Sequence, residues 1–129
     1  MAFPLPETIT DGVTTGHNGH HVDLHKLLNN NTNVQAGTAY TLVLADFGKI
    51  IELTSATAVT VTIPPSSSVA FPTGTVVEAT QLGTGVVTIA AGVGVTIRTP
   101  STLVLRAQYS TVSLRLRAVN EWVLAGDTT

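Results

Sequence analysis

The sequence predicts a mainly β protein, a small antiparallel β-sandwich or barrel preceded by an extended N-terminal arm and one short α-helix. Three observations support this prediction. Strand-like segments recur about every ten residues after residue 38. Several of them alternate apolar and polar side chains, and turns containing Gly or Pro separate them. Residues 1–37 show neither feature, so we assign 1–37 to attachment and oligomerisation and 38–129 to a β module.

The first sixteen residues predict an extended arm. Pro4 and Pro6 lie there with Gly12 and Gly16, and proline fixes φ and disfavours helix at the residue before it. Such a segment buries little of its own surface, so we expect it to lie on the β module or on a neighbouring subunit. The attachment residues that we expect in this arm are Phe3, Leu5 and Val13.

A short helix is predicted over residues 18–30, between Asn18 as the N-cap and the asparagines at 29–31. Its predicted contact face holds residues at spacings of three and four, namely His17, His21, Leu24, Leu27 and Leu28. A helix this short is marginal alone in water. We therefore expect this face to contact other subunits, for example in a symmetric bundle at an oligomer axis.

After a polar linker at 31–37, the β module begins with the stretch from Tyr40 to Leu53, two apolar strands joined at Asp46-Phe47-Gly48. The predicted strands span 39–45, 49–54, 58–63, 75–81, 85–90, 95–98, 102–106, 111–119 and 121–125. The last two predict a hairpin, and Trp122, the one tryptophan, is expected to cap an end of the core.

Composition favours a permanent oligomer and excludes several partners. Only 11% of the residues are charged and 43% are hydrophobic, which is little charge for a soluble monomer. A net charge of −2 gives no reason to expect nucleic acid. Without cysteine, disulfides and thiolate metal sites are excluded. No secretory signal or membrane-spanning run of about 20 apolar residues is present, so we expect synthesis in the cytoplasm and no membrane partner.

The histidine cluster near the predicted helix has two interpretations. His21 and His25 lie four residues apart and would share a helical face, an arrangement that can bind a metal through imidazole nitrogens. Alternatively, these histidines cap the helix or line an interface. We favour the second interpretation, because no His-Glu-x-x-His pattern accompanies them and Asp23 is the only nearby carboxylate.

No catalytic constellation is apparent, so we expect neither enzyme activity nor a cofactor. Glu52, Glu78, Asp46 and Glu121 have no histidine or nucleophile beside them in the sequence, and no Gly-x-Ser-x-Gly elbow is present. Short glycine pairs, such as those around Thr84, lack the helix and lysine of a phosphate-binding loop and predict turns.

Arg115 and Arg117 form a local basic pair on the polar face of a predicted strand. They are candidates for contact with an acidic protein surface or a glycan. The other interpretation is a solvated face, or ion pairs between subunits that contribute little each.

Several motifs resemble a β module that recurs in virion proteins of tailed bacteriophages. The segments that carry the resemblance are Tyr40–Leu53, Thr60–Thr75, Gly92–Ile97 and Trp122–Asp127. The segment Asp11–His17, with His20, His21 and His25, also resembles an N-terminal stretch of such proteins. Together these segments span most of the chain.

The resemblance implies a structural virion protein, commonly a homotrimer. One arm, one short helix and one β knob favour a capsid decoration or head-fibre protein, whose N-terminal segment would bind the major capsid protein or other virion proteins. The knob would then face outward on the virion. The alternative is a tail-fibre or tail-tip module that binds a receptor or glycan on the host surface.

Overall fold

The computed structural model describes residues 31–129, and Thr32–Thr129 form a compact unit. The predicted arm and helix lie outside the described residues. The same holds for the attachment residues Phe3, Leu5, Val13, His17, His21, Leu24, Leu27 and Leu28, and for the candidate metal ligands His21 and His25.

The described part of the chain is mainly β, as predicted. It contains nine strands, β1 (Thr32–Gln35), β2 (Ala39–Thr41), β3 (Ile50–Leu53), β4 (Val59–Ile63), β5 (Val76–Gln81), β6 (Val87–Ala91), β7 (Thr96–Arg98), β8 (Thr111–Ala118) and β9 (Glu121–Gly126). One 3-10 helix, η1 (Leu44–Asp46), lies between β2 and β3.

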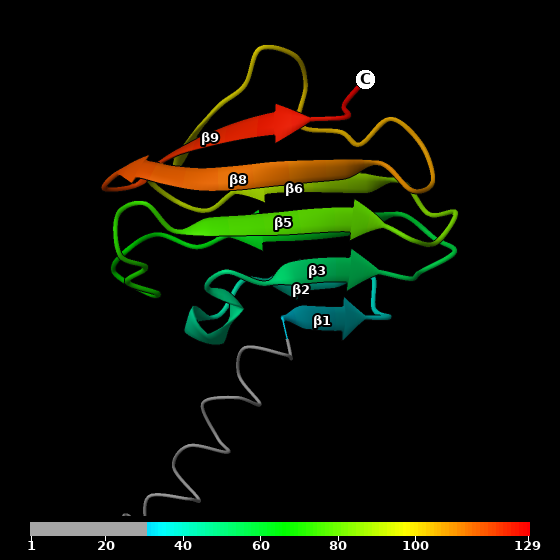
Figure 1. Ribbon diagram of the computed structural model, residues 1–129, viewed down its shortest axis with the longest axis horizontal. Helices are drawn as coiled ribbons and strands as arrows, with labels where there is room; N and C mark the ends of the chain where they lie inside the picture. The colour runs from blue at the N-terminus through cyan, green and yellow to red at the C-terminus, as the bar shows by residue number, and fades with distance from the viewer. Residues whose placement is uncertain (1–30) are drawn as a thin grey trace, which may run out of the picture. The chain divides into compact units, whose positions relative to one another are not determined.

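The first six strands form three stacked coils of a short solenoid-like arrangement. The chain alternates between two sheets, so β1, β3 and β5 pair in parallel in one sheet while β2, β4 and β6 pair in parallel in the other. In Figure 1 the sheet that contains β1, β3 and β5 faces the viewer, with β2 and β6 behind it. Each coil therefore contributes one strand to each sheet.

A hairpin closes the third coil. β8 pairs antiparallel with β5 and β9 pairs antiparallel with β8, which gives the six-stranded order β1-β3-β5-β8-β9-β7. The hairpin turn places Asn120 at φ 57, a left-handed conformation that asparagine tolerates, and its Oδ1 accepts the N–H of Ser66 at 2.8 Å. β8 thus occupies the position beside β5 that a fourth coil would take.

The core lies between the two sheets and follows from the alternation along each strand. Val59, Val61 and Ile63 of β4 are buried, whereas the threonines between them face outward. Trp122 of β9 is 2% exposed and meets the ring of Phe71 edge to face at 5.7 Å. The sequence predicts that Trp122 caps an end of the core, and the structure confirms that it belongs to the core.

The prediction of an antiparallel sandwich or barrel is wrong about the direction of the strands. Five of the seven strand pairings are parallel. The reason lies in how the strands are connected. Each strand of a coil is followed by a turn that leads into the other sheet. The next strand of the same sheet therefore belongs to the next coil and runs in the same direction. The predicted hairpin of the last two strands is confirmed.

Two local predictions also need correction. The expected linker at 31–37 contains β1, so β structure begins within the range that we assigned to the attachment segment. The strand expected over 102–106 is reduced to isolated bridges, in which Val104 pairs with Thr88 and Leu105 with Thr128.

Candidate functional site

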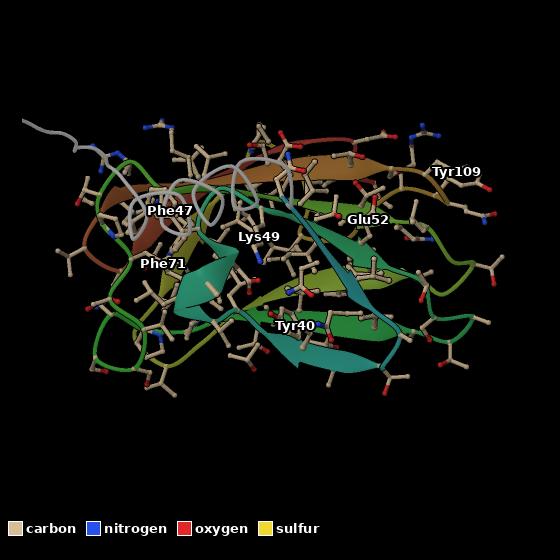
Figure 2. The ribbon with its side chains drawn as sticks, turned by 60° about the horizontal axis from the view of Figure 1, so that its bottom comes forward. Tyr40, Phe47, Lys49, Glu52, Phe71 and Tyr109 are labelled. Carbon is tan, nitrogen blue, oxygen red and sulfur yellow. The ribbon has the colours of Figure 1, made fainter. Side chains whose placement is uncertain are left out.

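The first coil encloses a polar layer centred on Asp46, which is 1% exposed at the end of η1. Its carboxylate accepts hydrogen bonds from Tyr40 Oη at 2.6 Å, Asn33 Nδ2 at 2.8 Å and the Val43 N–H at 2.9 Å. The amide of Gln35 extends the layer by donating to Asn33 Oδ1 at 2.8 Å. Figure 2 turns this end of the unit toward the viewer.

This polar layer explains how the coil stack ends. The inward positions of β1 are Asn33 and Gln35, in register with the buried Ile51 and Leu53 of β3. A stack of coils must finish on a surface that tolerates water, because a further apolar layer would be left uncovered. Within residues 31–129 the Asp46 cluster therefore forms a polar cap on the first coil.

This environment changes the pKa of the Tyr40 hydroxyl. Burial raises the pKa of Tyr40 from its ordinary 10.0 to about 12, and the hydrogen bond to Asp46 acts in the same direction. Since a buried carboxylate beside a phenolate is unfavourable, the phenol keeps its proton and serves as a donor.

The outer face of the six-stranded sheet carries a small charge network. Glu121 accepts Arg98 Nε at 3.2 Å and Arg117 Nη1 at 2.8 Å. The hydrogen bond from Arg98 is the main cause that lowers the pKa of Glu121. Arg115, the other member of the predicted basic pair, lies opposite Val123 of β9 and is exposed.

The structure thus brings three arginines to one region. Arg98 and Arg115 both pair in register with Val123, and Arg117 follows Arg115 on the same face of β8. The sequence indicated Arg115 and Arg117 but could not place Arg98 firmly beside them, because the contact depends on the parallel pairing of β7 with β9. With one carboxylate among three guanidinium groups, this surface can attract an anionic group.

A second ion pair joins the C-terminal segment to the loop before β8. Asp127 accepts Arg106 Nε at 2.7 Å and Nη2 at 2.8 Å, and Ser110 Oγ at 2.9 Å. The hydrogen bond from Arg106 is the main cause that lowers the pKa of Asp127. This bidentate pair fixes the loop before β8 to the C-terminal segment.

An exposed apolar patch surrounds η1 and was missed at the sequence level. The η1 patch consists of Val43, Leu44 and Phe47, with Val76 next to it through the hydrogen bond from the Gly48 N–H to the Val76 carbonyl. Phe47 is 54% exposed, and Figure 2 shows it beside Lys49 on the surface. Exposed apolar groups that gather in one place commonly contact another protein.

The hollow beside Phe71 and Trp122 is too small to serve as a substrate pocket. Its volume is about 40 Å³, and Pro64, Leu116 and Asn120 also line it. That volume holds about two or three water molecules, whereas ligand pockets measure roughly 300–1,000 Å³.

Of the carboxylates considered for catalysis, only Glu52 and Glu78 share one surface within the described range, the outer face of the paired strands β3 and β5. Glu52 and Glu78 lie on β3 and β5, Asp46 is buried in the cap, and Glu121 is paired with two arginines. Among residues 31–129, no three or more His, Cys, Asp or Glu side chains are grouped to hold a metal ion. No helix in this part of the chain is long and apolar enough to cross a membrane.

Comparison with known proteins returned no match for the chain, whether against family models, curated proteins or solved structures.

Proposed function

We propose that this chain is a non-enzymatic structural protein of a tailed-bacteriophage virion, a homotrimeric capsid decoration or head-fibre protein. The observation that carries this proposal is a compact unit of three coils, Thr32–Thr129, with a polar layer at its first coil and an antiparallel hairpin beside its third. The polar layer around Asp46 ends the coil stack on one side, and the β8–β9 hairpin ends it on the other.

A polar layer at one end and a hairpin at the other suit a compact knob better than a long fibre. A fibre that grows by stacking coils needs an apolar layer at each end, whereas here the inward residues of β1 are Asn33 and Gln35 and the hairpin takes the position beside β5. The N-terminal segment before β1, residues 1–31, would bind the major capsid protein or another virion protein. The β unit would then be displayed outward.

The distribution of charged groups supports a role without catalysis. Within residues 31–129, Asp46 and Asp127 are hydrogen-bonded in structural contacts, and the hollow near Trp122 has no room for a substrate. The exposed apolar residues of the η1 patch instead favour contact with protein.

Three measurements test the proposal. Light scattering of the purified chain should give about three times its mass of 13.4 kDa, and a monomer at micromolar concentration would contradict the trimer. Labelled chain should decorate the capsids of the phage that encodes it. A chain truncated to residues 31–129 should retain its β spectrum but no longer attach, and undiminished attachment would exclude the anchoring role of the N-terminal segment.

A second candidate function is favoured by the arginine surface. Arg98 and Arg117 flank Glu121, and Arg115 lies on the same face of β8 as Arg117, so the β unit is also suited to bind an acidic glycan on the host surface as part of a tail fibre or tail tip. Labelling of tails rather than capsids would select this function. Loss of cell binding in Arg115→Ala with Arg117→Ala, but not in Arg106→Ala, would support it further.

A further inference from the structure

One carboxylate organises the arginine surface of Arg98, Arg115 and Arg117. Each oxygen of Glu121 accepts a hydrogen bond from a different arginine, Oε2 from Arg98 Nε at 3.2 Å and Oε1 from Arg117 Nη1 at 2.8 Å. A guanidinium group carries five N–H donors. Because each of these two arginines uses only one nitrogen on Glu121, the other nitrogens can donate to a ligand.

A shift in strand register leads Arg117 to this contact. β8 and β9 pair up to Leu116 opposite Trp122, and the next pair is Ala118 with Glu121, so Arg117 has no opposite residue on β9. Bulges of this kind redirect a side chain. Arg98 and Arg117 are thus held by Glu121 before any ligand arrives, and a site ordered in advance loses less entropy on binding.

Arg115 supplies a third guanidinium group, which has no ion-pair partner among residues 31–129. It lies opposite Val123 on one side, and Arg98 lies opposite Val123 on the other. Two strand spacings of about 4.8 Å place the Cα atoms of the two arginines roughly 10 Å apart. Two side chains of this length can contact one small group above Val123.

The excess of positive charge is confined to one part of the six-stranded sheet. The outward positions of β7, β8 and β9 hold the three arginines and Glu121, whereas those of β3 and β5 hold Glu52 and Glu78. A long polyanion laid across the sheet would meet these two glutamates, which disfavours nucleic acid. A single anionic group on an otherwise neutral chain fits the local excess of positive charge.

The arrangement favours a phosphate over a carboxylate. A carboxylate has two oxygens, and one guanidinium fork occupies both. A phosphate monoester has three acceptor oxygens and carries about −1.5 to −2 charge at pH 7. It can therefore accept hydrogen bonds from Arg98 and Arg115 at once, and its charge matches three arginines beside one glutamate.

We propose that Arg98, Arg115 and Arg117 bind a phosphate monoester carried on a sugar of the host surface, with Glu121 as a positioning residue. This inference rests on the second candidate function, the binding of an acidic glycan, and names the anionic group that the site takes. Arg98 and Arg115 contact the phosphate from the two sides of Val123, while Glu121 holds Arg98 and Arg117 in place.

The first test measures the affinity of the full-length chain for a hexose monophosphate by isothermal titration calorimetry. Arg115→Gln should weaken binding at least about tenfold, because a charged, two-pronged donor is lost. Arg106→Gln is the matched control, since it removes the same charge from an exposed arginine that is paired with Asp127. It should bind like the wild type. Unchanged binding by Arg115→Gln would overturn the site, and circular dichroism checks that both variants remain folded.

The second test distinguishes a positioned site from a merely positive surface. Glu121→Gln removes a negative charge, so attraction alone would tighten phosphate binding. We expect weaker binding instead, by at least about threefold, because glutamine offers one acceptor oxygen and can hold only one of the two arginines. Glu78→Gln is the control, as it removes a negative charge from the same sheet and should not weaken binding. Tighter binding by Glu121→Gln would contradict the positioning role.

The third test compares ligands. The hexose monophosphate should bind at least about tenfold more tightly than glucuronate, which offers one carboxylate, and at least as tightly as inorganic phosphate. Equal binding of glucuronate would refute the choice of phosphate. Tighter binding of inorganic phosphate would make free phosphate the ligand and overturn the glycan source. Tighter binding of a short oligonucleotide would identify nucleic acid and overturn the proposal.

Competition on host cells separates this inference from the function on which it rests. The hexose monophosphate should displace labelled chain from the cells, and glucuronate should not. If cell binding requires Arg115 and Arg117 but only glucuronate displaces the chain, the second candidate function stands and this inference alone fails. If calorimetry gives the expected pattern but no cell is labelled, the phosphate site is supported, while its assignment to the host surface fails together with the second candidate function.

Discussion

Asp46 joins three segments through one buried carboxylate. Its partners come from β1, β2 and the start of η1, so they are brought together only when the first coil forms. Hydrogen bonds to a buried charged group are stronger than neutral ones, and each donor left without a partner carries a desolvation cost. Asp46 therefore contributes to stability although its sequence position predicts only a turn.

We expect Asp46→Ala to lower the free energy of unfolding by about 3 kcal/mol, because three donors lose their acceptor in a buried site. Urea denaturation followed by circular dichroism measures this. Glu52→Ala is the control, since Glu52 is partly exposed on β3 and should change stability by less than about 0.5 kcal/mol. Equal effects of the two substitutions would show that the cap does not stabilise the unit.

The raised pKa of Tyr40 predicts that the stability of the folded chain depends on pH in the alkaline range. Its pKa is raised to about 12 in the folded chain from 10.0, so the folded state holds the proton more tightly than the unfolded state does. The resulting stabilisation is complete below pH 10 and is lost as the pH rises toward 12. The stability difference between the wild type and Tyr40→Phe should shrink by about 1–2 kcal/mol across this window, allowing for the partial exposure of Tyr40. A constant difference would contradict the shift.

At the scale of elements, the corners of the solenoid depend on glycine. The turn from β5 to β6 lies on the turn from β3 to β4, with the Gly83 N–H bonded to the Leu53 carbonyl and the Gly85 N–H to the Ser55 carbonyl, both at 3.0 Å. A Cβ at Gly85 would collide with the backbone of Thr57. Close stacking of successive coils thus requires a residue without a side chain.

We expect Gly85→Ala to destabilise the unit by about 1–3 kcal/mol, because the backbone of one corner must move away from the other. Gly37→Ala is the matched control. Gly37 lies in the corner of the first coil, where the nearest atom to an added Cβ is the Ala39 carbonyl oxygen at 3.9 Å. Thermal unfolding of the two variants should separate them, and a Gly85→Ala variant as stable as Gly37→Ala would refute the close contact.

Most strand positions could be predicted from the sequence, but strand partners could not, apart from the β8–β9 hairpin. Alternation located β4 and β8 well because it reports burial of one face, and burial is the same in parallel and antiparallel sheets. β1 was missed because its inward residues are Asn33 and Gln35, whose partner Asp46 is known only from the folded coil. The candidate surface contacts Arg115 and Arg117 were found, while their neighbour Arg98 depended on long-range pairing.

One sequence signal of the parallel stack was present. β3 pairs with β5 and β4 pairs with β6 at the same separation of 28 residues, as in Ile50 with Glu78 and Val59 with Val87. Two strands of one coil and the corner between them recur at this distance, with Val59-Thr60-Val61 aligned to Val87-Thr88-Ile89. Only two coils share the period, since Thr32 pairs with Ile50 at a shorter separation. A search for repeats that requires more than two copies does not detect this 28-residue period.

At the scale of the molecule, the β unit should fold without the N-terminal segment. The core residues, the polar layer and the hairpin all lie within Thr32–Thr129. A chain of residues 31–129 should therefore unfold in one cooperative transition, with a midpoint within a few degrees of the full-length chain when both are monomeric. A broad transition, or none, would show that the unit depends on residues 1–30.

The two ends of the coil stack have different structures. The coils between them share one structure. Because the first coil joins the stack through the pairing of β1 with β3, and the hairpin joins it through the pairing of β8 with β5, relatives of this chain can differ in height by whole 28-residue coils between them. Each added coil would raise the unit by about 4.8 Å while both ends keep their sequences. Variation in length is thus expected to occur in the interior of the β unit, in multiples of one coil.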